Sequence, residues 1–488
     1  MKRTQCIGVH FPGGIISPGY LLQLLQIAET CRVEEVKWSL RQELILHVPL
    51  KHLSQFQEGC IHQNIDWFVW KDKRPNITSS YVSTSIFSND SWLTEGMYKD
   101  VFNMFDTSAL TLNVNICDRK QTFAPLFTGH LNWITSDNVH YWHLFIRLPG
   151  TDRLFMWPDE IYTNHIGMVT GAIENVLCMQ MFDVADWNEV VKEIKQHVPY
   201  IGKTVDTVPT IPAFHLPYYE GFNRYTGGYW LGIYRRKEFF PIDFLQDLCK
   251  LCLDTKIGQL YATAWKSLVI KNIESEHRVL WDNILNKHRI NVRHAANELN
   301  WQVEDNNEDA LVLKRQIIRQ FDIEDVRTYG LVFCIQLKKF RGMFGSVIIR
   351  KSNNPANGLK VLDKFDLLHT KDFNPNEQQL ILYRDNVPKI HLGTYLISLC
   401  KHYYETKNTA KQIELPTQSE STGAGVREKK IYQCPTCLSV YDEALGEPGQ
   451  NIAAGISFME LAEKYACFIC EEPGKHFREV ACSVNGSV

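Results

Sequence analysis

Four cysteines stand in two close pairs, and each pair has two residues between its members. They are Cys434 and Cys437, followed after 29 residues by Cys467 and Cys470. A Cys-x-x-Cys turn places two sulfurs on one side of a tight loop, and two facing turns make a tetrahedral cage of four thiolates. This geometry selects iron or zinc. One pair alone is a weak signal, whereas two pairs at this interval predict a metal centre.

The residues around these cysteines carry a family resemblance. The matching segments are Tyr432-Gln433-Cys434-Pro435-Thr436-Cys437, Val440-Tyr441-Asp442, Gly446-Glu447-Pro448, Gly455-Ile456-Ser457-Phe458 and Cys467-Phe468-Ile469-Cys470. From Ile431 to Val480 the chain resembles rubredoxin. The resemblance implies a small three-stranded module whose four cysteines bind one iron and carry single electrons without an organic cofactor. It also implies an aromatic core made by Tyr432, Tyr441, Phe458, Tyr465 and Phe477.

The chain departs from the rubredoxin pattern at several places, and two of them directly follow the cysteine pairs. The family normally has glycine after the second cysteine of each pair, where this chain has Leu438 and Glu471. Those glycines help to direct backbone N–H groups at the sulfurs, so the replacements bear on the reduction potential more than on the ligand set. A structural zinc site with the same four ligands is the alternative. The aromatic residues and the interval between the pairs favour iron.

Two further pairs of potential ligands are interpreted as structural. Cys249 and Cys252 form a third Cys-x-x-Cys pair, but they lie on the apolar face of a predicted helix, which favours a buried core position. His140 and His143 are placed on a predicted strand, where an odd spacing directs side chains to opposite faces. We therefore expect neither pair to bind a metal.

A basic group surrounds Gly342 and Gly345 in a predicted hairpin. A solvated surface is the default interpretation, and a site for an anion or a partner protein is the alternative. The basic residues are Lys338, Lys339, Arg341, Arg350 and Lys351.

A polar stretch separates the chain into a long body and a short module that contains the four cysteines. Residues 404–430 contain almost nothing to bury and predict a flexible linker before a module at 431–480. In the body that precedes the linker, we expect a half-domain at 1–100, a strand-rich middle at 101–222, and a second, divergent half-domain with an extension at 223–403.

A weak internal repeat appears when the sequence is displaced by 224 positions against itself. Ile7-Gly8-Val9-His10 then aligns with Leu231-Gly232-Ile233-Tyr234. Each copy shows the pattern of a strand, a helix, a second strand and a second helix, and the second strands are expected at Val36 to Val48 and at Leu260 to Ile273. The sequence thus predicts an α+β body of two ferredoxin-like β-α-β-α half-domains with a strand-rich middle.

The first copy also carries a family resemblance. The residues concerned are Pro12-Gly13-Gly14-Ile15-Ile16 and Ser39-Leu40-Arg41-Gln42. They resemble the ferredoxin-like half-domain of nitrite and sulfite reductases. The resemblance implies that Arg41 contacts sirohaem or its bound anion, and the alternative is an exposed strand arginine without a ligand. The aligned element of the second copy, Thr263-Ala264-Trp265-Lys266, keeps a basic group but not the family sequence.

The family's second cofactor is not expected here. Such reductases need four paired cysteines for a [4Fe-4S] cluster, and between residues 291 and 430 this sequence has only Cys334 and Cys400. We therefore expect no such cluster, while sirohaem or another anionic cofactor is possible.

Composition limits the class of protein. A net charge of -3 argues against a general nucleic-acid binder, and no segment has the roughly 20 apolar residues of a membrane span. The start of the sequence lacks the apolar core of a secretory signal, so we expect a soluble, cytoplasmic protein without a membrane partner.

Three functional hypotheses follow. The leading one is an electron carrier with one rubredoxin-type iron, whose body docks a redox partner protein, in a setting such as nitrite or sulfite reduction. The second is an oxidoreductase whose body binds sirohaem or another anionic cofactor and receives electrons from the module. The third is a binding protein with structural zinc. The sequence leaves open whether the protein is an enzyme.

Overall fold

The computed structural model describes residues 4–482 apart from 73, 89–90, 108, 183, 185, 207, 339–341, 343, 353–362, 415–428, 436–438, 444, 448–449, 451, 462–464 and 469–471. Contacts between residues divide the chain into two compact units, Met1–Thr409 and Ala410–Val488. Among the helices of the described ranges, none combines the length and the apolar character needed to cross a membrane.

Two small sheets of the first unit carry the internal repeat. The strands of the first sheet, in order, are β15 (Phe240–Pro241), β3 (Glu35–Trp38), β4 (Leu44–Pro49), β1 (Thr4–Val9) and β5 (Phe68–Val69). The strands of the second are β13 (Gly221–Tyr225), β14 (Gly228–Ile233), β17 (Leu268–Ile273), β16 (Leu260–Ala262) and β2 (Ile15–Ile16). Since β15 and β2 each join the sheet of the opposite copy, the two copies fold as one structure.

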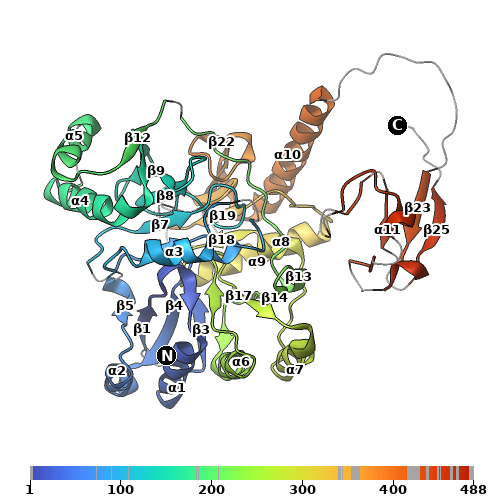
Figure 1. The fold of residues 1–488 in the computed structure, drawn as a ribbon, viewed down its shortest axis with the longest axis horizontal. Helices are drawn as coiled ribbons and strands as arrows, with labels where there is room; N and C mark the ends of the chain where they lie inside the picture. Colours follow the sequence, from blue (N-terminus) through green and yellow to red (C-terminus); the bar gives the residue numbers. More distant parts are fainter. Residues whose placement is uncertain are drawn as a thin grey trace. The chain divides into compact units, whose positions relative to one another are not determined.

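Four helices cover one side of these sheets and lie in a row below them in Figure 1. They are α1 (Pro18–Thr30), α2 (Leu53–His62), α6 (Ile242–Asp254) and α7 (Arg278–Lys287). Apolar residues recur at helical spacing on α1 and α6, so each helix turns one stripe inward. Leu21 and Leu25 of α1 and Leu245 of α6 are fully buried in a single core shared by both copies.

Each copy has one strand more than its sequence pattern predicts. Val36–Val48 contains β3 and β4, and Leu260–Ile273 contains β16 and β17, so the units are β-α-β-β-α. In the turns between the strands, Gln42 and Lys266 have φ angles of 64° and 54°. A residue in this left-handed region reverses the chain. Because apolar residues continue on both sides of the turn, periodicity alone does not reveal it.

The middle region forms a mixed sheet in the order β12-β11-β9-β8-β7-β6. Its strands are β6 (Ile77–Ser79), β7 (Val114–Cys117), β8 (Leu131–Thr135), β9 (Tyr141–Arg147), β10 (Leu154–Met156), β11 (Asp159–Tyr162) and β12 (Gly202–Thr204), with helices α3 (Glu95–Phe102), α4 (Ile166–Met179) and α5 (Trp187–His197). The strands expected in this region are present. The sheet begins at Ile77, however, earlier than the boundary expected at residue 101, because β6 pairs with β7.

The region after the second copy forms a sheet in the order β18-β19-β20-β21-β22. Its elements are β18 (Trp301–Val303), β19 (Phe333–Gln336), β20 (Val347–Lys351), β21 (Lys364–Thr370), β22 (Leu380–Pro388), α8 (Ala296–Leu299), α9 (Glu308–Ile323) and α10 (Leu392–Glu414). From β18 to β20 neighbouring strands are parallel, and from β20 to β22 they are antiparallel. The middle sheet shows the same sequence of pairings, parallel from β6 to β8 and antiparallel from β8 through β9 to β11. The repeat therefore extends through both halves of the body.

Helix α10 overlaps the segment expected as a linker. It runs to Glu414, whereas the sequence predicts a flexible linker from residue 404 onward. Buried Leu396, Leu399 and Tyr403 hold the earlier turns of the helix to the core, and the backbone continues as a helix beyond them. Most of the expected linker, residues 415–428, lies outside the described residues.

The second unit contains a three-stranded antiparallel sheet in the order β24-β23-β25. Its elements are β23 (Lys429–Gln433), β24 (Val440–Tyr441), β25 (Arg478–Cys482) and the short helix α11 (Phe458–Leu461). This is the small three-stranded module that the sequence predicts.

Candidate functional site

Two of the four predicted metal ligands lie in the described part of the second unit. Cys434 follows β23 and is fully buried, and Cys467 is 2% exposed. The other two, Cys437 and Cys470, lie outside the described residues, as do Leu438 and Glu471. The ligand set as a whole therefore stays a prediction.

The backbone makes the same hydrogen bond at both described cysteines. The N–H of Cys434 donates to the carbonyl of Ser439 at 2.8 Å, and the N–H of Cys467 donates to the carbonyl of Glu472 at 2.8 Å. Each bond closes a tight turn over the same number of residues. The two turns are thus related by a local repeat, as two facing Cys-x-x-Cys loops require, and they fit a four-thiolate metal site.

Aromatic side chains fill the core of the module. Tyr432 stacks on Phe458 with ring centroids 4.3 Å apart, and Phe458 meets Tyr465 edge-on at 5.4 Å. The Tyr441 hydroxyl donates to the carbonyl of Ile456 at 2.9 Å, so its polar end is satisfied. Cys434 and Cys467 are themselves shielded from water, which strengthens the electrostatic effect of dipoles aimed at their sulfurs.

Arg41 lies in the turn between β3 and β4 and is only 7% exposed. Its guanidinium donates to the Asn76 side chain and carbonyl at 2.5 and 3.1 Å, to the Asn115 side chain at 3.1 Å and to the Val114 carbonyl at 3.1 Å. Burial lowers its pKa to about 10, and Arg147 adds to this effect. The alternative of an exposed strand arginine is wrong, and the contact with an anion stays a prediction.

The aligned turn of the second copy carries a different charge arrangement. Lys266, which is 3% exposed, pairs with Glu238 at 2.9 Å and with Asp305 at 3.4 Å. Asp305 also accepts the N–H of Leu40 at 3.0 Å, so it joins the two turns. Lys266, the basic residue that the second copy keeps in this turn, is therefore paired with two carboxylates of the body.

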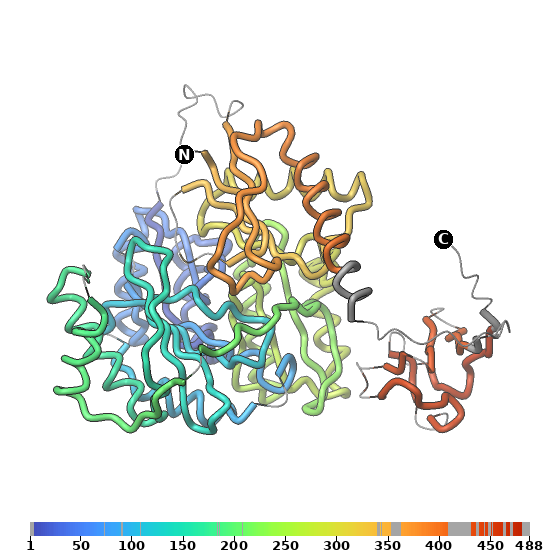
Figure 2. The backbone as a smooth tube through the Cα atoms, turned by 90° about the horizontal axis from the view of Figure 1, so that it is seen from above, coloured from blue at the N-terminus to red at the C-terminus, as the bar shows by residue number. Residues whose placement is uncertain are grey.

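A basic cavity of about 250 Å³ lies between the middle sheet and the last sheet of the body. Its lining residues come from β9, β19, β20, β21 and β22 and from the loops beside them. The teal middle region and the orange end of the body lie side by side in Figures 1 and 2. The charged lining residues of the cavity are Arg147, Lys338, Arg350, Lys351, Asp152 and Glu377. Three of its cations come from the basic group that the sequence shows, whereas Lys339 and Arg341 of that group lie outside the described residues.

Arg147 enters this cavity from β9, far from the basic group in sequence. The residue is 6% exposed, and Nη2 donates to the carbonyl of Thr128 at 2.7 Å. Gly342 passes over the guanidinium with a φ of 82°, and a Cβ on Gly342 would lie 2.3 Å from Nη2. The left-handed φ favours glycine at this position. Sequence reasoning missed Arg147 because nothing in its local pattern connects it with the hairpin.

The two further pairs of potential ligands lie in different surroundings. Cys249 and Cys252 are fully buried in the core, and burial raises the pKa of Cys249 to about 12. His143 lies on β9 with Nε2 3.6 Å from Glu160, while His140 is exposed and precedes the strand with a φ of 66°. The two histidines differ in their surroundings because His140 lies in the turn before β9 and only His143 lies on the strand. The alternation of side chains along a strand, which the sequence predicts for both, does not apply to His140.

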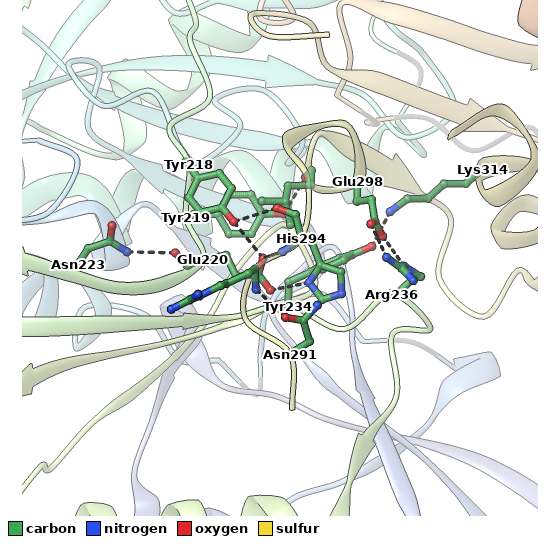
Figure 3. Close-up of polar contacts among 12 residues, drawn as sticks. Tyr218, Tyr219, Glu220, Asn223, Tyr234, Arg236, Asn291, His294, Glu298 and Lys314 are labelled. Atoms are coloured by element: carbon green, nitrogen blue, oxygen red, sulfur yellow. Dashed lines mark hydrogen bonds and ion pairs between the residues drawn. The ribbon is translucent and has the colours of Figure 1, made fainter. Parts of the chain in front are cut away.

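A partly buried polar network that sequence reasoning missed lies near the end of β14 (Figure 3). Lys314 of α9 donates to the Tyr234 hydroxyl at 2.8 Å, and Arg236 pairs with Glu298 at 2.5 Å. Burial lowers the pKa of Lys314 to about 8. On α9 this lysine interrupts the apolar face, and that interruption is the one sequence signal that could have identified it.

Comparison with known proteins places both units. Residues 431–477 match the model of the family Rubredoxin. Probable Rubredoxin-2 of Methanocaldococcus jannaschii is 42% identical over 53 residues, which are 11% of this chain and 94% of that protein. The structure of the Mycobacterium tuberculosis NirA protein is similar with a TM-score of 0.60 at 13% identity, over 86% of this chain and 82% of that chain.

The two likenesses have different weight. At 13% identity the likeness to NirA shows the fold alone, and it confirms the fold that we expect for the body. The match over 431–477 rests on sequence and coincides with the three-stranded unit that holds the two buried cysteines. Through these residues the chain belongs to the rubredoxin family.

Proposed function

We propose that this protein transfers single electrons by means of one iron held by Cys434, Cys437, Cys467 and Cys470, and that its body docks a redox partner. The observation that carries the proposal is the rubredoxin match over 431–477, in which Cys434 and Cys467 are buried in related turns. An iron bound to four thiolates would supply a reversible one-electron couple. A setting of nitrite or sulfite reduction is suggested by the resemblance of residues 12–16 and 39–42 to that reductase family, and the fold shared with NirA agrees with it.

The chain's own residues keep this couple isolated and accessible. Backbone hydrogen bonds at Cys434 and Cys467 hold the two turns in place, which would limit reorganisation when the charge of the site changes. Phe468, next to Cys467, is 56% exposed and offers a short route to a partner. The module thus combines a shielded site with an exposed apolar side chain beside one ligand.

Metal analysis and a redox titration of the full chain test this proposal. We expect one iron per chain, a red colour in the oxidised protein, and reversible bleaching on addition of one electron. A colourless protein filled with zinc after expression with abundant iron would instead support the structural-zinc alternative.

A second candidate function is favoured by the basic cavity. In this alternative the body binds an anionic ligand between Arg147 and Arg350, and the module supplies electrons to it internally. A cavity of about 250 Å³ is smaller than the roughly 300–1,000 Å³ of pockets that enclose drug-sized ligands. The cations that line this cavity suit a small oxyanion such as nitrite, sulfite or phosphate.

Calorimetry with nitrite, sulfite and phosphate distinguishes this candidate. If the body binds an oxyanion here, Arg350→Ala should weaken its binding at least tenfold, whereas Arg327→Ala, on an exposed arginine outside the cavity, should not. Absence of binding by all three anions would leave the body as a docking unit. An absorption band beyond that of the iron site would show that it holds a larger cofactor.

A further inference from the structure

A serine hydroxyl approaches one of the cysteine sulfurs from the opposite turn. Ser439 Oγ lies 3.0 Å from Cys467 Sγ, and the two residues are 28 positions apart in the sequence. Ser439 belongs to the turn of Cys434, whereas Cys467 belongs to the other turn. The contact therefore joins the two halves of the metal site.

The backbone holds Ser439 in place on both sides. Its carbonyl accepts the N–H of Cys434 at 2.8 Å, and the next residue, Val440, begins β24, which pairs with β23. Cys467 is 2% exposed, so water does not compete freely for its sulfur. A hydroxyl held in this way needs little ordering when the sulfur gains charge.

The corresponding position of the other turn has different chemistry. Glu472 accepts the N–H of Cys467 as Ser439 accepts that of Cys434, but its carboxylate pairs with His476. An ionised carboxylate accepts hydrogen bonds and cannot donate one to a thiolate. Among the described residues, the two turns therefore differ at this position. Ser439 can donate a hydrogen bond to a sulfur, and Glu472 cannot.

The direction of the hydrogen bond follows from the ligand chemistry. A cysteine that binds a metal is a thiolate and has no proton to give, so the Ser439 hydroxyl must be the donor. A donor near a thiolate stabilises negative charge, and this effect is largest in the reduced site, which carries one more electron. Removal of the donor should therefore lower the reduction potential.

We propose that Ser439 is a positioning residue that donates a hydrogen bond to Cys467 Sγ and raises the reduction potential of the iron site. This inference rests on the proposed function, since it requires iron at the four cysteines. Its expected size is a shift of up to about tenfold in the ratio of oxidised to reduced protein, which equals about 59 mV for a one-electron couple.

The test compares substitutions in the full chain that differ in the hydroxyl. Ser439→Thr keeps the hydroxyl, and Ser439→Val replaces it with a methyl group of similar size. We expect the Thr variant to stay close to the parent in potential and the Val variant to fall by up to about 59 mV, with Ser439→Ala falling in the same direction. Spectroelectrochemical titration of the iron absorption measures all of them.

A matched control uses another serine of the same module. Ser457 donates to Glu443 at 3.0 Å, so Ser457→Ala removes a hydroxyl of comparable burial that contacts a carboxylate and not the described sulfurs. Its potential should stay at the parent value. Equal potentials for the Thr and Val variants, or an equal fall in the Ser457 control, would overturn the inference.

Failure of the inference differs from failure of the proposed function. If the parent chain binds no iron, the electron-transfer proposal fails and no potential exists to compare. If the parent binds iron and the Val variant loses it while the Thr variant keeps it, the hydroxyl is required to hold the ligand, which supports the contact. Loss of iron in both variants overturns it, because then the size of the side chain matters and the hydroxyl does not.

Discussion

Burial does not distinguish the predicted ligands from other cysteines of the described chain. Cys249, Cys334 and Cys400 are as deeply buried as Cys434 and Cys467. Burial raises the pKa of Cys249 and Cys400 to about 12, so their thiols stay protonated in an apolar core. A metal ligand must instead be a thiolate. The tight turns closed by backbone hydrogen bonds at Cys434 and Cys467 provide the appropriate setting.

Replacement of one ligand should remove the iron. We expect Cys434→Ser to reduce the iron content from one per chain to near zero and to abolish the visible absorption, because a neutral hydroxyl is a poor substitute for a thiolate. The body should unfold as before. Cys178→Ser, on an exposed cysteine of the body, is the control and should stay red. Full colour and iron in the Cys434 variant would refute the assignment of the ligand.

At the scale of elements, the second copy of the repeat packs on α9 through charged groups. Lys314 reaches Tyr234 beyond the end of β14, and both side chains are buried. The low pKa of Lys314, about 8, results mainly from burial and means that the charged form is destabilised in the folded body. The contact therefore costs stability wherever the lysine is charged.

The stability cost of the buried Lys314 depends on pH. Below about pH 8 the lysine is charged in both states and the cost is complete. As the pH rises from 8 to 10.5, the folded state loses the proton first and the cost disappears. Lys314→Met combined with Tyr234→Phe should thus be more stable than the parent at pH 7, by up to about 3 kcal/mol. This advantage should vanish towards pH 10.5.

Urea unfolding followed by tryptophan fluorescence measures this effect in the body alone, because all 12 tryptophans lie between Trp38 and Trp301. Lys401→Met, on an exposed lysine of α10, is the control. A stability difference between the Lys314 variant and the parent that does not change with pH would show that the lysine is not the titrating group.

At the scale of the whole molecule, charge is divided between the cysteine module and the rest of the chain. Residues 431–480 carry eight acidic and three basic side chains, a net charge of -5, so the rest of the chain carries +2. Four thiolates around an iron would make the module still more negative. Such a division favours transient docking of the module on a basic surface of its own body or of a separate reductase.

Electron transfer from the module should therefore depend on salt. Charges at a docking surface are screened over a Debye length of about 8 Å at physiological ionic strength, so the transfer rate should fall several-fold from low to high salt. Reversal of charge at Lys338, Lys339 and Arg341 should reproduce this loss if the body is the dock. Stopped-flow kinetics provides the measurement. A rate indifferent to both changes would mean that the contact is apolar or lies elsewhere.

Removal of the module tests the body for a cluster of its own. The sequence lacks paired cysteines between residues 291 and 430, so a chain shortened before Ile431 should contain no iron-sulfur cluster. We expect its iron content to fall to near zero while tryptophan fluorescence still reports a folded body. Iron that persists with sulfide after the deletion would contradict this expectation.

The sequence alone determined the parts that depend on local chemistry. The spacing of Cys434, Cys437, Cys467 and Cys470 and the residues around them predicted the module, because knuckle turns and thiolate ligands are encoded over a few residues. The displacement of 224 positions indicated the repeat of the body for a similar reason, since apolar periodicity records which face of each element is buried.

Only the tertiary structure decided which distant residues meet. The turn between β3 and β4 contains the left-handed Gln42, and the apolar residues on both sides of it did not reveal it. Arg41 is buried because it meets Asn76, which lies 35 positions away in the sequence. Arg147 joins the basic cavity, and Ser439 reaches Cys467, through contacts between separate elements. Periodicity and motif spacing describe neighbours along the chain, whereas these contacts depend on how the folded elements pack against one another.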